Sequence, residues 1–380
     1  MITNHVAVFV ALSAIVAIAI QLERRVSLFR SLGAALTGIL IGMLFSNVGV
    51  LPGTSRTYEF LMGPGVNLGI VLILLSVDLR SVLQAGPRML AAFGIGAAGT
   101  AIGAVIGGLA LSHAIGPETW KLSGQFTGTY TGGGANFAAL GGAFQTSPNL
   151  FSAATAADVI VTTVWMATCL AVPVLLGRPK LTQTPEEKAA AAKRPPTLER
   201  MLEVSARPVS LMDAAMLVTI AVGAVLAAEQ LARVTPVPNV LWLTTVALLI
   251  GQIPAVKRLS GSAMFGNYLL LLFLASNGAS SVVANLIEAG PPVFYFAAIT
   301  VLVHGLIIFG VGHVARLDWG TLAVASQANV GGPASAVALA GARGYADRIL
   351  PGVAVGLLGY AAGNYVGYGV AALVRTVLGA

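Results

Sequence analysis

The chain has 380 residues, of which 57% are hydrophobic and only 9% are charged, and its formal net charge is +7. Soluble globular chains carry roughly 25% charged residues, so this composition excludes a soluble globular protein and predicts an all-α integral membrane protein. The basic residues are scattered over short segments, which membrane topology explains better than a nucleic-acid partner does. The single cysteine, Cys169, lies in an apolar run and cannot form a disulfide within the chain, so we expect it to be a small buried hydrophobe.

Ten apolar segments are long enough to predict membrane-spanning helices. In chain order these predicted spans are residues 5–22, 30–50, 60–78, 89–112, 150–177, 211–232, 239–255, 263–287, 292–313 and 349–374. Two arginines, Arg24 and Arg25, follow the first span, and no basic residue precedes it. A cleaved signal peptide has the opposite flanks, so we expect the first span to be retained.

Two segments between the spans, residues 121–148 and 318–346, differ from the rest of the chain. Their middles read TGTYTGGGANFAALGG (127–142) and SQANVGGPASAVALAG (326–341). Glycine and proline break helices and leave N–H and C=O groups in directions that an intact helix does not offer. Such backbone is tolerated at membrane depth only where protein or a water-filled cavity lines it. We therefore predict that each segment stops near the membrane midplane as a re-entrant hairpin.

The two halves of the chain resemble each other. Aligning Gly132–Gly142 with Gly331–Gly341 gives six identities in eleven positions, and the tripeptide AGP recurs at 85–87 and 289–291. The aligned window is short and rich in alanine and glycine, so chance similarity is the alternative. The shared order of features along both halves favours an internal duplication.

The duplication predicts a first repeat at 1–177, a linker at 178–208 and a second repeat at 209–380, each repeat with five spans and one hairpin. If both glycine segments re-enter, 17 Lys and Arg residues lie inside and 4 outside, whereas full crossing gives at best 13 against 8. The positive-inside rule favours the first arrangement, with both termini outside and the linker in the cytoplasm. Because five spans plus one hairpin make an odd number of crossings, the second repeat is expected to be inverted.

Half-helices that start near Ala135 and Ala334 would aim their N-termini at the midplane. Such ends attract anions, and unwound carbonyl groups coordinate Na⁺. The predicted substrate-binding residues are Thr129, Tyr130, Thr131, Gly132, Gly133, Gly134, Asn136, Asn329, Gly331, Gly332, Ser335 and Asn364. The predicted cation-binding residues, with Na⁺ as the candidate ion, are Asp158, Thr127, Ser326, Gln327 and Asn277. Close helix packing is the alternative explanation for the glycines, but it does not explain the polar side chains beside them.

Asp158 is the only carboxylate well inside a predicted span. Intramembrane carboxylates usually face a cavity or carry an ion or a proton, and a structural, hydrogen-bonded aspartate is the alternative. In the last predicted span, Tyr360 and Asn364 share one helical face. Ligand binding and helix–helix hydrogen bonding are both open for that pair.

Enzyme chemistry finds no support in the sequence. The four histidines are isolated, and neither an HExxH-type pair nor a nucleophile elbow is present. The glycine spacing of GIGAAGTAIGAVIGG (94–108) is like a dinucleotide fingerprint, but it lies in a predicted span with no strand before it. We expect no catalytic residues and no resident cofactor, with Na⁺ or H⁺ as the coupling ion.

The motifs TGTYTGGGANFAAL and ANVGGPASAVALA, with ten predicted spans around them, resemble the YjcL-like family of uncharacterised membrane proteins of bacteria and plastids. The resemblance covers essentially the whole chain and implies the inner (cytoplasmic) membrane of a bacterium. More distantly, the chain is similar to sodium–glutamate symporters and 2-hydroxycarboxylate transporters. That similarity implies an elevator-type architecture, in which a core moves against the scaffold of a homodimer.

The chain departs from the glutamate symporters at its hairpins. GGGAN lacks the histidine expected after paired glycines, and no Arg or Lys lies near either tip. The identity of the substrate is therefore not carried over.

The expected function is secondary active transport of a small anionic organic solute across the lipid bilayer, coupled to Na⁺ or H⁺ by an elevator mechanism. One alternative is a monovalent cation–proton antiporter that uses Asp158. The other is a non-transporting sensor or scaffold built on a transporter fold.

Overall fold

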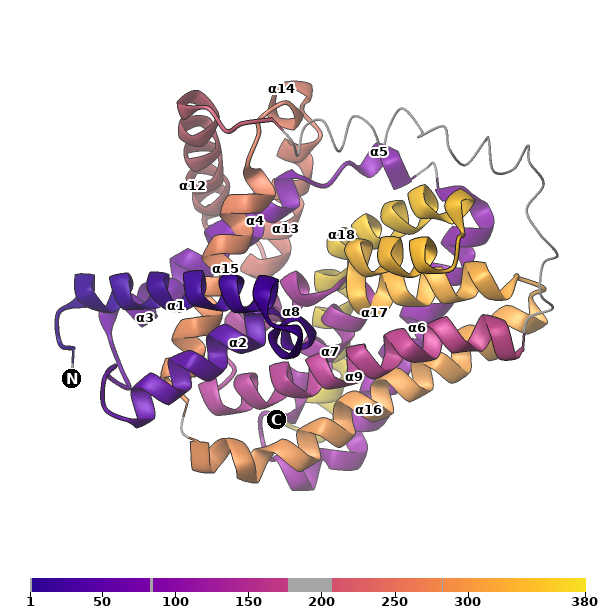
Figure 1. Ribbon diagram of the computed structural model, residues 1–380, viewed down its shortest axis with the longest axis horizontal. Helices are drawn as coiled ribbons and strands as arrows, with labels where there is room; N and C mark the ends of the chain where they lie inside the picture. The colour runs from indigo at the N-terminus through magenta and orange to yellow at the C-terminus, as the bar shows by residue number, and fades with distance from the viewer. Residues whose placement is uncertain (1, 83–84, 177–206, 282) are drawn as a thin grey trace.

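The computed structural model describes residues 2–82, 85–176, 207–281 and 283–380, and its helices divide into two groups (Figure 1). The flanking group consists of α1 (His5–Arg25), α2 (Ser27–Asn47), α3 (Arg56–Phe60), the π-helix η1 (Leu61–Gly65), α4 (Val66–Leu75), α12 (Leu211–Val234), α13 (Asn239–Gly251), α14 (Pro254–Lys257) and α15 (Ser262–Ala279). The hairpin group consists of α6 (Gly86–Ile115), α7 (Thr119–Gly132), α8 (Gly134–Ala143), α9 (Pro148–Leu175), α16 (Val283–Val314), α17 (Trp319–Ala342) and α18 (Ala346–Leu378). The short helix α5 (Leu79–Val82) lies between the two groups along the chain. The predicted linker 178–208 lies outside the described residues, apart from residues 207 and 208.

Packing within each group is far more extensive than packing between the groups. The largest interfaces of the hairpin group join α6 to α16, α7 to α18 and α17 to α18, and those of the flanking group join α2 to α15, α1 to α2 and α4 to α15. The interfaces between the groups, such as α2 with α9 and α4 with α8, are much smaller. In Figure 1 the flanking group lies mainly at the left and the hairpin group mainly at the right.

The all-α membrane class predicted from composition is confirmed, since every regular element in the described ranges is a helix. Seven helical segments of these ranges are long and apolar enough to cross a membrane: His5–Arg25, Arg56–Leu75, Gly86–Ile115, Pro148–Leu175, Leu211–Val234, Gly290–Val314 and Ala346–Leu378. The other three predicted spans fall on α2, α13 and α15, which are helical but shorter or less apolar. In α2 a kink at Gly33 (φ 74°) shortens the apolar helix to Leu32–Asn47.

One glycine-lined face of α18 packs along the hairpin group. The glycines of this face follow each other at helical spacing: Gly352, Gly356, Gly359, Gly363 and Gly367. A Cβ atom at Gly356 would lie 2.7 Å from the Cα of Pro333, and one at Gly359 would overlap the carbonyl oxygen of Thr131. Helix α18 therefore approaches the backbone of both glycine segments as closely as a helix can.

We predict that Gly359→Ala destabilises the fold and that Gly369→Ala does not. The added methyl group at position 359 overlaps backbone atoms of Thr131 and Gly132, whereas nothing lies within 4 Å of a Cβ at Gly369. Overpacking of this kind costs about 1–3 kcal/mol, while alanine is the better helix former by about 1 kcal/mol at an open position. Thermal unfolding of the two purified variants in detergent measures the difference. Equal midpoints would show that α18 is free to move away from the hairpins.

Candidate functional site

The first glycine segment forms a helical hairpin with its tip at Gly133. Helix α7 ends at Gly132, Gly133 adopts φ 88° and ψ 175°, and α8 begins at Gly134. A side-chain-bearing residue rarely adopts this backbone conformation, which explains why glycine stands there. The two arms run antiparallel, because the Lys121 ammonium at the start of α7 donates to the Gln145 carbonyl beyond the end of α8 (3.0 Å).

The second glycine segment repeats this geometry within α17. Gly332 has φ 76° and ψ −170° and is followed by Pro333, which cannot continue the hydrogen bonding of the preceding turn. The base of the hairpin is closed where Arg348 forms an ion pair with Asp318 (2.9 Å). Gly133 and Gly332 are the two positions that the sequence alignment pairs with each other.

The tips of the two hairpins touch. A Cβ atom at Gly133 would lie 3.8 Å from the Cα of Gly332, and the Tyr360 ring lies over both glycines, 3.3 Å from a Cβ at Gly133 and 3.8 Å from one at Gly332. The Asn136 amide donates to the Gly359 carbonyl of α18 (3.1 Å). Gly134, directly after the first break, and Ala334, two residues after Gly332, are exposed. The N-terminal ends of both second arms are therefore not covered by other described parts of the chain.

Four side chains just before the breaks carry buried polar atoms without a hydrogen-bond partner in the described chain. These atoms are Tyr130 Oη, Thr131 Oγ1, both amide atoms of Gln327 and Asn329 Oδ1. A buried polar atom without a partner costs about 1–3 kcal/mol, so such groups are rare and point to a ligand, an ion or water. Here they lie within six residues of a helix break on each hairpin.

Asp158 lies on α9 beside the first hairpin. Its carboxylate accepts a long hydrogen bond from the Thr162 hydroxyl (3.4 Å). The Tyr130 phenol lies close to the same carboxylate, but the two groups do not form a well-made hydrogen bond. The geometry thus brings the predicted cation ligand Asp158 next to the predicted substrate ligand Tyr130.

A buried histidine, His304 of α16, joins four other helices of the hairpin group. Its Nδ1 lies 2.8 Å from the Gly96 carbonyl oxygen and 3.0 Å from the Thr100 hydroxyl, and its Nε2 lies 2.8 Å from the Ser326 hydroxyl. The Trp165 indole donates to Ser326 (2.9 Å), and Thr100 donates to the Tyr130 carbonyl (2.9 Å).

The partners of His304 fix its tautomer. A carbonyl oxygen only accepts, so Nδ1 carries the proton, and Nε2 of the neutral ring accepts from the Ser326 hydroxyl. The Ser326 oxygen then accepts from Trp165, which is only a donor. Every donor in this chain has an acceptor when His304 is neutral, so the network holds α6, α7, α9, α16 and α17 in one arrangement.

The remaining predicted site residues are distributed unevenly. Thr129, Gly132, Gly331 and Ser335 lie at the two tips, as does Tyr360. The Thr127 hydroxyl donates to the Ser123 carbonyl of its own helix (2.7 Å), and Ser326 is hydrogen-bonded to His304 and Trp165.

Two predicted site residues lie in other parts of the fold. Asn277 lies on α15 of the flanking group, and the Asn364 amide donates to Thr244 of α13 (2.9 Å). Neither asparagine is brought to the tips.

Sequence reasoning missed His304 and Trp165. His304 was set aside as an isolated histidine, although it lies within the predicted span 292–313, where an ionisable side chain is itself a signal. Trp165 carried no such signal, because its partners Ser326 and Gly305 are distant in the chain.

Comparison with known proteins identifies relatives of this chain. A family model described as "Protein of unknown function (DUF819)" matches residues 8–377. The "Uncharacterized membrane protein YjcL" of Bacillus subtilis (strain 168) is 28% identical over 365 residues, which cover 92% of each chain. The resemblance to the YjcL-like family is therefore confirmed, together with a multi-pass integral membrane location.

We predict that His304→Gln destabilises the protein. The flexible glutamine amide does not place a donor at the Gly96 carbonyl and an acceptor at the Ser326 hydroxyl at the same time, as the two ring nitrogens of histidine do. The polar groups left without a partner cost about 1–3 kcal/mol each. His113→Gln, at an exposed position of α6, is the matched control and is expected to unfold at the wild-type temperature. Thermal unfolding followed by circular dichroism compares them. Wild-type stability in His304→Gln would contradict the role of the network.

Glu118, at the base of the first hairpin, predicts a dependence of stability on pH. Burial raises the pKa of its carboxyl, but hydrogen bonds from the Ser147 backbone N–H and the Lys121 ammonium outweigh burial and lower the pKa below the usual 4.5. Because the folded-state pKa is the lower one, ionised Glu118 stabilises the fold above pH 4.5, and this contribution is lost as the pH falls through the folded-state pKa.

Glu118→Gln is accordingly expected to lower stability by at most about 1 kcal/mol near neutral pH, since the carboxyl is partly exposed to solvent. The difference from the wild type should shrink in acid. Unfolding midpoints of both proteins between neutral and acidic pH provide the measurement, and a difference that does not change with pH would contradict the assignment.

Proposed function

The chain belongs to the DUF819 family of proteins of unknown function, and we propose that it is a secondary active transporter for a small anionic organic solute, coupled to Na⁺ or H⁺. The observation that carries this proposal is the meeting of two helix breaks, Gly133 and Gly332, surrounded by buried polar atoms without partners. Broken helices whose ends meet inside the bundle are the usual solute and ion sites of secondary transporters.

The proposed solute site lies at the exposed starts of the two second arms. The backbone N–H groups of Gly134 and Ala135 after the first break, and of Ala334 and Ser335 after Pro333, lie at the positive ends of helix dipoles, which favour an anionic group. The Thr131 hydroxyl and the Gln327 amide have no other partner, whereas the Asn329 amide nitrogen already donates to the Phe93 and Ala325 carbonyls and only its Oδ1 is without one. A carboxylate would be held by the neutral donors of Thr131 and Gln327, since no Lys or Arg lies in either tip.

The proposed coupling-ion site lies beside the Tyr130 and Asp158 pair. Within the described residues there is no cluster of three or more His, Cys, Asp or Glu side chains. A bound Na⁺ would therefore be held by the Asp158 carboxylate together with hydroxyl, amide and carbonyl oxygens near the breaks. In the proton-coupled version, Asp158 itself would carry the proton.

The order of the helices supports inverted repeats and an elevator-type movement. In each half of the chain, helices of the flanking group come first and elements of the hairpin group follow. The first half has α1, α2 and α4 followed by α6, α7–α8 and α9, and the second half has α12, α13 and α15 followed by α16, α17 and α18. Because the interfaces between the two groups are small, the hairpin group could move as a unit relative to the flanking group. We propose that both termini lie outside, that residues 178–208 are cytoplasmic, that the protein resides in a bacterial inner membrane, and that the flanking group forms a homodimer contact.

A cation–proton antiporter is the second candidate, favoured by one observation. Asp158 is a partly buried carboxylate in an apolar helix and lies close to the Tyr130 phenol. An antiporter would exchange ions in the absence of any organic solute, and Asp158→Asn would abolish that exchange.

Uptake by proteoliposomes tests the proposal. The double variant Gly133→Leu with Gly332→Leu is expected to lose more than about 90% of Na⁺- or pH-driven uptake from a panel of labelled mono-, di- and tricarboxylates, because strain of about 1–3 kcal/mol per glycine distorts both tips. Gly341→Leu is the control, since it lies on the second arm of α17 in open space. Undiminished uptake by the double variant would show that the tips are not the solute site.

A further inference from the structure

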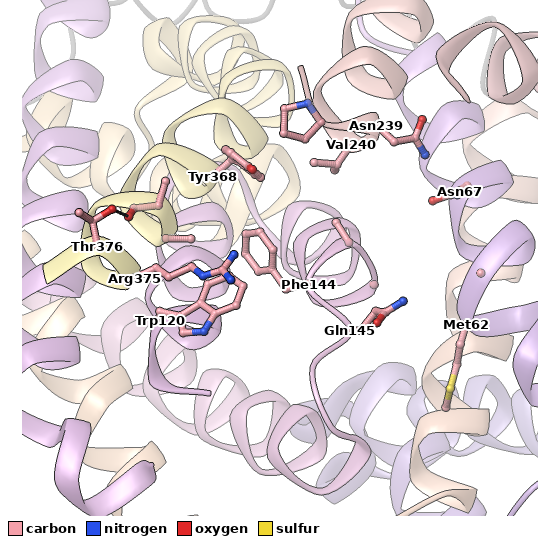
Figure 2. Close-up of a pocket in the computed structure, with 16 residues that line it drawn as sticks. Met62, Asn67, Trp120, Phe144, Gln145, Asn239, Val240, Tyr368, Arg375 and Thr376 are labelled. Carbon is pink, nitrogen blue, oxygen red and sulfur yellow. Dashed lines mark hydrogen bonds between the residues drawn. The ribbon is translucent and has the colours of Figure 1, made fainter. Parts of the chain in front are cut away.

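A pocket of about 510 Å³ lies away from the hairpin tips, at the boundary between the two helix groups (Figure 2). On one side it is lined by the base of the first hairpin and the end of α18, and on the other by η1, α4 and the start of α13. No residue from Gly132 to Asn136 belongs to its lining. The volume is in the range of pockets that bind small molecules.

The hairpin-group side of the pocket combines a cation with an aromatic wall. The Arg375 guanidinium lies 4.9 Å from the centre of the Trp120 ring, and Trp120 contacts Phe144, which in turn contacts Tyr368. Arg375 donates through Nε to the backbone oxygen of Ala380 (2.9 Å), and the described residues show no hydrogen bond from its other two guanidinium nitrogens. Stacking on Trp120 holds the guanidinium in place.

The opposite side of the pocket carries two amide side chains among apolar residues such as Met62 and Val240. Asn67 of α4 and Asn239 of α13 lie on the other side of the pocket from Arg375 (Figure 2), and Asn239 Oδ1 is a buried atom without a partner in the described chain. Among the described residues that line the pocket, Arg375 is the only charged one. Glu118, the nearest acidic residue along the first hairpin, is engaged by Lys121 and by the Ser147 backbone.

We propose that this pocket is a second ligand site, for a small organic anion that carries a carboxylate beside a flat apolar body. The carboxylate pairs with Arg375 in the two-point geometry that guanidinium favours, the apolar body lies against Trp120 and Phe144, and the amides of Asn67 and Asn239 meet the remaining polar groups. The amides on the facing wall suit a soluble anion better than a lipid chain. The ligand touches both helix groups at once, so it favours the arrangement in which the pocket is formed.

The probe is benzoate, with benzyl alcohol as its uncharged counterpart, added to the purified protein in lipid-free detergent at constant ionic strength. Benzoate is expected to change tryptophan fluorescence saturably and to raise the unfolding temperature, whereas benzyl alcohol is not. Arg375→Gln should raise the Kd for benzoate at least about tenfold, the loss expected for a charge-assisted hydrogen bond. Arg233→Gln, an exposed arginine in the last turn of α12 and outside the pocket, is the matched control and should bind normally.

Two further variants locate the response. Trp120→Phe keeps the aromatic wall, so the thermal shift should remain while the fluorescence change is reduced. Gln327→Leu, at the second hairpin tip, should leave benzoate binding unchanged, which separates this pocket from the proposed solute site. Unaltered benzoate affinity in Arg375→Gln, or lost binding in Gln327→Leu, would each overturn the proposal.

A final arm distinguishes a soluble anion from a lipid headgroup. Phosphatidylglycerol is added in place of benzoate. If only this lipid stabilises the wild type, and Arg375→Gln removes its effect, the pocket binds an anionic headgroup and the soluble-anion proposal is overturned. Stabilisation by benzoate in the absence of lipid is the result that supports it.

Discussion

A polypeptide inside a membrane has to satisfy its backbone hydrogen bonds within the protein, and two glycines with positive φ interrupt that pattern at matching places in this chain. Gly133 and Gly332 adopt nearly the same backbone angles and meet inside the hairpin group. The interruption frees N–H groups at the starts of two half-helices and carbonyl groups at the ends of two others. Those freed groups would be costly in an inert protein, and they are what a solute or an ion can use.

The surrounding packing holds this arrangement in place. The glycine face of α18 runs along both hairpins, and the neutral His304 network ties α6, α7, α9, α16 and α17 together. In contrast, the boundary with the flanking group carries small interfaces, such as the bond between Asn364 and Thr244. A well-packed group that carries the hairpin tips and has only small interfaces with the other group is what the proposed elevator movement would require.

The sequence predicted the features that local chemistry determines. The three consecutive glycines at 132–134 and the Gly-Gly-Pro run at 331–333 predicted the helix breaks, and the apolar composition predicted the helical membrane class. The surroundings of Asn364 and His304 did not follow, because each depends on a partner that is distant in the chain, Thr244 for the first and Gly96 and Ser326 for the second. Helical periodicity placed Asn364 on the face of Tyr360, yet only packing decides which neighbour that face meets.

The measurement that tests the central idea most directly is the thermal stability of the purified protein in Na⁺ against choline, at constant ionic strength and at several pH values. A ligand that binds only the folded state at a hundredfold excess over its Kd stabilises it by about 2.7 kcal/mol. The account predicts a Na⁺-specific or pH-dependent stabilisation that is lost in Asp158→Asn and weakened in Gln327→Leu. Wild type and both variants responding identically to Na⁺ and to pH would contradict a coupling-ion site at the hairpin tips.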